Sequence, residues 1–129
     1  MKIVKNEKCS FCNKELEDIV HFLYECEIST NIWKETEYWI NDCSHVHVKF
    51  SLHNIIFGFE EKRNDALNCL VCIVKQHLFL QKLNSKIPVF AHIKKKILQY
   101  YEDERYFSSI SGLFNKFNAK WMSLHSLFT

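Results

Sequence analysis

The sequence is poor in the residues that make tight turns. Among its 129 residues there are two glycines and one proline. Folds built from many short β-strands need glycine and proline at their turns, so this scarcity argues against them and favours helices joined by short loops. Linkers rich in proline, glycine or serine are also absent, as are low-complexity tracts. We therefore expect one domain, residues 1–129, without disordered segments.

Long apolar runs are lacking as well. The basic opening MKIVKNEK is not followed by the apolar segment of a secretory signal peptide. No run of about eighteen apolar residues occurs, which predicts no transmembrane helix and no membrane partner. We therefore expect an intracellular protein, in the cytoplasm or the nucleus. The six cysteines then stay reduced, and clustered cysteines tend to be metal ligands.

The chain does contain enough apolar material for a core, since 47% of its residues are hydrophobic. Their spacing predicts helices over about 16–25, 28–42, 52–57, 65–84, 88–107 and 109–122, with 45–50 as an extended connector. Ser29 and Thr30 are alternative N-caps of the second helix, and Pro88 suits the first turn of the fifth. The fourth helix is apolar nearly all round, as a central buried helix would be.

The stretch CSFCNKELEDIVHFLYEC, residues 9–26, has the spacing C-x2-C-x8-H-x4-C. Three cysteines and one histidine are a common donor set for structural zinc, which predicts one Zn²⁺ held by Cys9, Cys12, His21 and Cys26. On an ideal helix Cys26 lies about 500° round from His21, so both reach one ion only if Cys26 follows the helix end. The alternatives are a disulfide, which leaves His21 unexplained, and four residues that are simply buried. A closed site of this kind is structural and not catalytic.

The remaining cysteines and histidines form weaker patterns. Cys69 and Cys72 also have C-x2-C spacing, but they lie in an apolar helical run and are expected in the core. Cys43, His45 and His47 lack a nearby fourth ligand, so we expect surface or core roles for them and leave a second metal site open. The predicted fold is all-α, with a zinc-binding knuckle in residues 1–30 and a helical bundle in 31–129.

The first block, CSFCNKELEDIVHFLYECEISTNIWKETEYWI, resembles the zinc-binding C-terminal region of reverse transcriptases from LINE-type (non-LTR) retrotransposons. That family has a C-x2-C knuckle, a short acidic run, a histidine in an apolar helix, a cysteine, and a tryptophan some seven residues later. The residues that match this pattern are Cys9, Cys12, His21, Cys26 and Trp33. Downstream, the segments that follow the family's order are IIFGF, LNCLVCIVKQHLFLQKL, IPVFAHIKKKILQYYEDERYF and the tail around Trp121. The resemblance therefore covers nearly the whole chain.

The resemblance implies a non-catalytic domain that binds RNA or DNA in support of target-primed reverse transcription, beside a polymerase domain. The family's paired catalytic aspartates have no counterpart here, and no other constellation indicates an enzyme. The chain looks like the C-terminal domain alone, as part of a longer protein, a truncated element copy or a small stand-alone gene.

Charge indicates where a nucleic acid would bind. Residues 1–65 carry a net charge of −4, and residues 66–129 carry +6. Phosphate contacts supply affinity without reading sequence. The candidate residues for them are Lys75, Lys82, Lys86, Lys94, Lys95, Lys96 and Arg105. Candidate base-stacking residues are Tyr100, Tyr101 and Tyr106. The alternative is that the tyrosines are core and the lysines a solvated helix face.

A second function stays open on sequence alone. A zinc-stapled helical module that docks on a polymerase or another protein would bind nucleic acid weakly or not at all. It would expose an apolar patch among Phe107, Phe114, Trp121 and Phe128.

Overall fold

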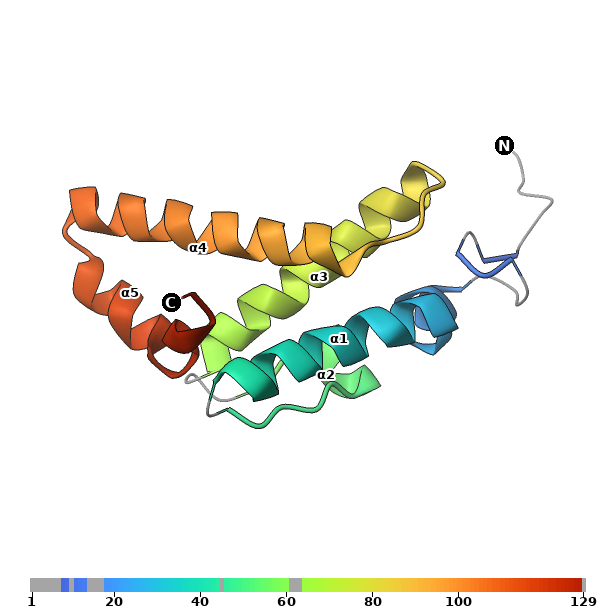
Figure 1. Cartoon of the computed structure of the whole chain (residues 1–129), viewed down its shortest axis with the longest axis horizontal. Coiled ribbons are helices and arrows are strands. Elements are labelled where there is room, and N and C mark those ends of the chain that lie inside the picture. The colour runs from blue at the N-terminus through green and yellow to red at the C-terminus, as the bar shows by residue number, and fades with distance from the viewer. Residues whose placement is uncertain (1–7, 10, 14–17, 45, 61–63, 129) are drawn as a thin grey trace.

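The protein is an all-α domain, seen here in a computed structural model that describes residues 8–9, 11–13, 18–44, 46–60 and 64–128. Its elements are η1 (His21–Glu25, a π-helix), α1 (Glu27–Cys43), α2 (Leu52–Phe57), α3 (Asp65–Leu83), α4 (Phe90–Ser111), α5 (Phe114–Trp121) and η3 (Met122–Phe128, a 3₁₀-helix). Helix α3 lies between α4 and α1, and α5 with η3 closes the end away from the N-terminus (Figure 1). No β-strand occurs in these residues, so the predicted fold class is confirmed.

Helix α1 buries the stripe that its spacing predicts, with Ile32, Trp33 and Trp39 among the buried residues. The connector after it has no regular secondary structure over the described residues 46–50. Asn41 fixes the connector by bonding both the N–H and the C=O of Val48, at 2.8 and 3.1 Å. Ser51 then caps α2 by accepting from the N–H of Asn54 at 3.2 Å.

Helix α3 is central, but its apolar surface is not buried all round. One face is buried along most of its length, through residues that include Leu70, Val74 and Leu78. Phe79, Leu80 and Leu83 near its C-terminal end are exposed instead. The expectation of burial on every side is therefore wrong for the last turns, because the C-terminal end of α3 extends beyond the start of α4 (Figure 1).

The break between the last two helices lies later than predicted. Helix α4 continues to Ser111 and ends at Gly112, whose φ of 77° is left-handed and suits a residue without Cβ. The N–H of Leu113 returns to the C=O of Ser108 at 2.9 Å and completes the cap. Helix α4 begins at Phe90, so Pro88 precedes the helix and does not lie in its first turn.

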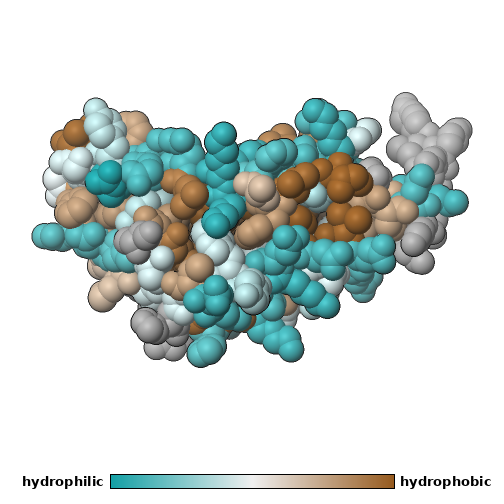
Figure 2. All heavy atoms as spheres, in the orientation of Figure 1, coloured by the Kyte–Doolittle hydropathy of each residue, from teal (hydrophilic) through white to brown (hydrophobic). Residues whose placement is uncertain are grey.

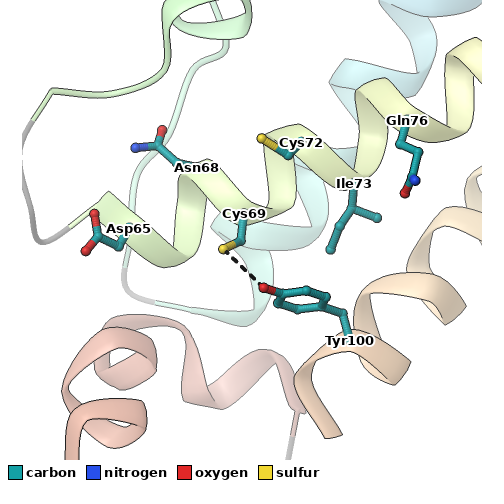
Figure 3. Close-up of a pocket in the computed structure, with 7 residues that line it drawn as sticks. All are labelled: Asp65, Asn68, Cys69, Cys72, Ile73, Gln76 and Tyr100. Atoms are coloured by element: carbon teal, nitrogen blue, oxygen red, sulfur yellow. Dashed lines mark hydrogen bonds between the residues drawn. The ribbon is translucent and has the colours of Figure 1, made fainter. Parts of the chain in front are cut away.

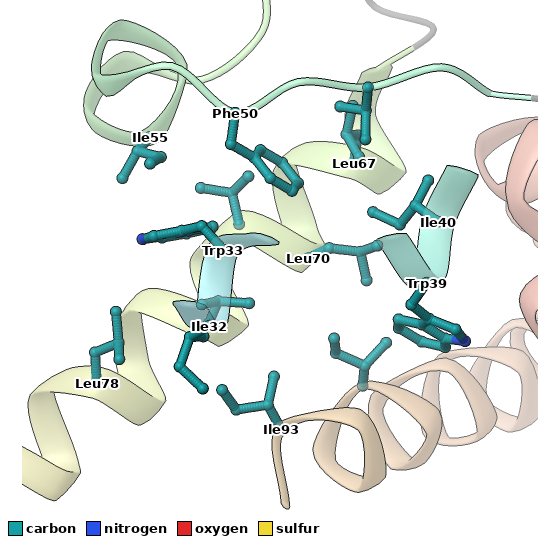
Figure 4. Close-up of a cluster of buried hydrophobic side chains, with 14 of the residues drawn as sticks. Ile32, Trp33, Trp39, Ile40, Phe50, Ile55, Leu67, Leu70, Leu78 and Ile93 are labelled. Carbon is teal, nitrogen blue, oxygen red and sulfur yellow. The ribbon is translucent and has the colours of Figure 1, made fainter. Parts of the chain in front are cut away.

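The main core lies where α1, α3, the connector and the start of α4 meet. Figure 4 shows Trp33 and Phe50 against α3, with Trp39 and Ile93 at the α4 side. The rings of Trp33 and Phe50 have centroids 5.2 Å apart, and Trp39 meets Phe90 edge-on at 6.0 Å. These aromatic pairs connect segments that are distant in sequence, and each contributes about 0.5–1.5 kcal/mol beyond its buried area.

A second, aromatic cluster holds the C-terminal elements on α4. The ring of Tyr101 stacks on Phe128 at 3.8 Å, and its hydroxyl lies 3.0 Å from Nδ1 of His125. Trp121 is fully buried and meets Tyr101 edge-on at 5.3 Å. Trp121 and Phe128 therefore belong to the interior and not to an exposed patch. Phe107 and Phe114, from the same expected patch, are exposed.

One buried histidine stands out in the α3–α4 interface. His77 is 3% exposed, and no described donor or acceptor pairs with either of its ring nitrogens. Burial lowers the pKa of His77, and the positive charges of Lys96 and His92 lower it further. The folded protein therefore keeps this ring neutral, whereas the unfolded chain protonates it near pH 6.5.

His77→Leu should raise the free energy of unfolding by about 1 kcal/mol at pH 7, because it removes two buried polar atoms without partners. The gain should grow as the pH falls below about 6.5. In the parent, the unfolded chain then binds a proton at His77 that the folded protein does not, which lowers the free energy of unfolding, and the variant lacks this loss. Urea titrations of both proteins from pH 7.5 to about 5 measure the difference. His53→Leu, at an exposed position of α2, is the control. If the difference in free energy of unfolding between His77→Leu and the parent did not change with pH, the assignment of His77 as a buried neutral ring would be contradicted.

Candidate metal centre

A tight turn presents the first two cysteines. The N–H of Asn13 bonds the C=O of Cys9 at 2.9 Å, and Asn13 has a left-handed φ of 61°. Asparagine tolerates this conformation better than most residues, so the turn closes directly after Cys12. Cys9 is fully buried and Cys12 is half-buried, so one ligand faces the interior and the other lies nearer the surface.

Asp18 starts the helical segment that carries the histidine. Its Oδ1 accepts from the N–H of His21 at 2.8 Å, and its C=O accepts from the N–H of Phe22 at 2.9 Å. This is N-capping, which satisfies donors that a helix start leaves free. The expected helix begins at 16, but residues 14–17 lie outside the described residues, and the helical backbone described here begins at Ile19. Sequence reasoning placed Asp18 inside the helix, although an aspartate before an apolar run is a known capping signal.

The segment after Asp18 is a π-helix, and this geometry brings the last two ligands together. The N–H of Cys26 bonds the C=O of His21 at 2.7 Å, five residues back. This wider turn returns Cys26 to the side of His21, where an α-helix would place it far round the axis. Cys26 itself has extended backbone angles, φ −60° and ψ 134°, between η1 and α1. The expectation that Cys26 follows the helix end is confirmed.

The four side chains converge on one point. Sγ of Cys9 lies 3.8 Å from Sγ of Cys26, and Sγ of Cys12 lies 3.4 Å from Nε2 of His21. All four donor atoms lie within 4.8 Å of one another. The group is close enough to bind a metal ion, and it is the one such Cys, His or carboxylate cluster among the described residues. Cys9, Cys12 and Cys26 form no disulfide, so the disulfide alternative is not adopted.

Burial sets the electrostatics of Cys26. It raises the pKa of this thiol to about 11, and the backbone N–H groups of Ile28 and Ser29 at the start of α1 oppose the shift. The nearby Cys9 thiol raises the pKa further, because two thiolates side by side repel each other. A cation among these sulfurs removes that repulsion, so metal binding must release thiol protons.

Three side chains of α1 hold the ligand-bearing segment in place. Ser29 donates to the C=O of Phe22, Thr30 to the C=O of Tyr24, and Trp33 to the C=O of Leu23. These carbonyls lie in a single short turn that has few partners of its own. Ser29 and Thr30 were expected from the sequence to be N-caps of α1. They are not, because both lie inside the helix. The N-cap position belongs to Cys26, and a module boundary at residue 30 would fall inside α1.

Aromatic contacts join the metal centre to α3. The ring of Phe22 lies 5.3 Å from that of Phe11 and 5.2 Å from that of Phe79. Nζ of Lys82 lies 5.8 Å from the centre of the same Phe22 ring, within the range of a cation–π contact. The centre is therefore packed against the bundle and does not depend on the backbone connection alone.

Among the residues that the structure describes, the other cysteines and histidines are not gathered into a site. Cys43 and His47 are exposed, and His45 lies outside the described residues. Cys72 is exposed, which corrects the expectation that it lies in the core. Cys69 is half-buried against the core, with its sulfur 3.9 Å from the hydroxyl of Tyr100. Both cysteines line an open groove with Asn68 and Tyr100, in which the two sulfurs point in different directions (Figure 3).

The predicted phosphate-binding residues do not form one patch. Nζ of Lys94 lies over the ring of Trp39 at 5.4 Å, on the α1 side of α4. Lys96 is close enough to lower the pKa of His77 on α3, so it faces the other side. Arg105 pairs with Glu102 at 2.8 Å. Consecutive residues diverge by about 100° on a helix, so the run 94–96 cannot present one flat basic surface.

The remaining candidates lie at separate places. Lys75 lies beside Phe57 of α2, Lys86 is exposed in the α3–α4 loop, and Lys95 is exposed on α4. Among the tyrosines, Tyr106 is well exposed and Tyr100 is partly exposed, but Tyr101 is buried and unavailable for base stacking. One lysine that was not among the candidates, Lys120, is half-buried between Glu104 and the rings of Tyr100 and Trp121. Its role is to hold α5 on α4.

Comparisons with known proteins add no relative. No family model, no curated protein and no solved structure matches the chain. Among the described residues, no helix has the length and apolarity needed to cross a membrane. What the centre can do therefore follows from its donors and their geometry.

The purified chain should bind one divalent metal ion, and Cys26→Ser should weaken binding at least about 100-fold, because a first ligand matters more than the outer contacts that cost 10–100-fold. Affinity should fall as the pH is lowered, since protons compete with the metal for the thiolates, above all at Cys26, whose pKa burial raises to about 11. Metal analysis and a competitive chelator titration measure both. Cys43→Ser, at an exposed position outside the cluster, should bind as the parent does. Equal loss in the two variants would contradict the site.

Proposed function

We propose that this chain is a zinc-stapled, non-catalytic domain that binds nucleic acid, of the kind found in the C-terminal region of LINE-type reverse transcriptases. The observation that carries the proposal is the convergence of Cys9, Cys12, His21 and Cys26, the four residues on which the resemblance rests. Trp33 supports it further, because the fifth residue of that pattern bonds the turn between the two last ligands. The metal would be structural.

Zinc is the ion that these donors suit best. Zn–S bonds of about 2.3 Å in a tetrahedron place two sulfurs about 3.8 Å apart, and a sulfur and a nitrogen about 3.6 Å apart. The corresponding distances here are 3.8 Å for Cys9 and Cys26 and 3.4 Å for Cys12 and His21. Three thiolates and an imidazole complete the coordination of zinc. No position remains for a substrate, which supports a non-catalytic role.

The surface that suits nucleic acid is the outer side of α4. Lys95 is exposed there and Lys96 is exposed at the edge toward α3, and residues 66–101 contain six lysines without a single aspartate or glutamate. The surroundings of the metal centre are less suitable, because three thiolates and Zn²⁺ sum to −1 and residues 1–65 are already acidic. Phosphates would therefore approach the α4 side of the molecule, where the potential is positive.

Lys95→Glu with Lys96→Glu should weaken RNA or DNA binding about tenfold or more and lower the slope of log K against log salt by about 1.5 units, the value for two lost phosphate contacts. Fluorescence anisotropy with labelled RNA, single-stranded DNA and duplex DNA at several salt concentrations measures this. Lys34→Glu on the exposed side of α1 carries the same charge change per residue and is the control. If the affinity changed neither with salt concentration nor with the double substitution, the assignment of this surface would be refuted.

Protein docking is the second candidate, and exposed apolar residues favour it. Phe107 and Ile110 at the end of α4 are 62% and 64% exposed, and Phe114 at the start of α5 continues the same patch. A chain that binds one zinc ion but no nucleic acid at low salt would favour this candidate. It would then dock on a polymerase domain or another protein.

A further inference from the structure

A second apolar surface lies at the opposite end of the molecule, where α3 passes into α4. It consists of Leu80, Leu83, Ile87 and Val89, which we call the tip surface. Leu83 is 73% exposed, and the other three are 40–49% exposed. Figure 2 shows hydrophobic side chains gathered on this face, beside the α3–α4 loop and the N-terminal half of α1. Apolar groups gathered on a surface in this way commonly mark an interaction site.

The backbone holds these side chains in a defined arrangement. Leu80 and Leu83 lie one turn apart on the same side of α3. The loop returns along the helix end, because the N–H of Lys86 bonds the C=O of Gln81 at 2.8 Å. Ile87 and Val89 flank the buried Pro88, so in this extended segment they point the same way, away from the core. The tip surface is therefore preformed.

The charged residues that flank the tip surface in the sequence are basic. Lys86 lies within the loop, and His92 and Lys96 follow in the first turns of α4, where both lower the pKa of His77 on α3. No aspartate or glutamate occurs in residues 66–101. Asp18 lies with Phe79 and Lys82 in a separate groove. A partner that matches this surface must be apolar at its centre and negatively charged at its rim.

We propose that the tip surface binds an acidic amphipathic helix of a partner protein. Such a helix buries its apolar stripe on Leu80, Leu83, Ile87 and Val89, and its carboxylates face Lys86, His92 and Lys96. Nucleic acid is a poorer match, because aliphatic side chains offer bases no aromatic ring to stack on. An anionic bilayer is also a poorer match, because Leu83 alone among the four side chains is more than half exposed.

The test uses the full chain with zinc and a labelled peptide of about 20 residues, long enough to form a helix. The peptide carries leucines at i, i+3, i+4 and i+7 and glutamates on its other faces. A matched peptide has lysine in place of every glutamate. We expect the acidic peptide to bind, and the basic peptide to bind at least about tenfold more weakly. Equal binding of the two peptides would overturn the proposal.

Two matched variants test whether the peptide binds at the tip surface. Leu83→Ser should weaken acidic-peptide binding about tenfold, because a leucine buried in the complex is lost. Leu113→Ser, at an exposed leucine at the other end of α4, should leave it unchanged. Circular dichroism checks that both variants fold. Equal affinity in the two variants, or binding to phosphatidylserine vesicles that Leu83→Ser abolishes, would also overturn the proposal.

Binding of an acidic helix does not depend on binding of nucleic acid, so experiments can refute either one while the other stands. Leu83→Ser changes no charge, so it should leave RNA affinity and its salt dependence as in the parent. Loss of peptide binding with intact RNA binding shows that RNA does not use the apolar part of the tip surface. A chain that binds RNA but not the acidic peptide would overturn this inference and leave the proposed function standing.

Discussion

The structure depends first on the turn that joins His21 to Cys26. An ordinary helical turn would point these ligands in different directions, and the five-residue hydrogen bond from Cys26 to His21 removes that conflict. Such a turn is uncommon because it packs less favourably than an α-helix. Here α1 supports it from outside, since Ser29, Thr30 and Trp33 each donate to one of its carbonyls. The metal centre and the bundle are therefore parts of one arrangement, with Cys26 as the last ligand and as the first cap of α1.

Several of the basic side chains serve the fold itself. Lys82 lies over Phe22, Lys94 over Trp39, and Lys120 over Trp121 and beside Glu104. Cation–π contacts of this kind use the charge of a lysine without burying its ammonium group completely. A count of lysines therefore overstates the charge that is available to a partner. The outer side of α4 and the α3–α4 loop carry the lysines without such a contact, Lys95 and Lys86 among them.

The success of sequence reasoning varied with the range of the interaction. Helix α1 and the four candidate metal ligands follow from neighbours within a few residues, and both were predicted. The end of α4 was predicted too early, at 107, because the apolar pattern of the next helix starts before Gly112 and continues past it. The helix in fact ends at Gly112. Cys72, Phe79 and Leu83 were expected in the core because they lie in an apolar run. Which face of that run is covered depends on helices elsewhere in the chain.

The sequence by itself determined the all-α class, the donor set of the metal centre and the excess of positive charge in the second half, because composition and short spacings carry that information. Only the tertiary structure decided that Lys94 and Lys96 face different helices, and that Trp121 lies inside while Leu83 lies outside. The physical reason is the same in each case. A side chain's surroundings depend on segments that are far away in the chain, and no local pattern encodes where those segments pack.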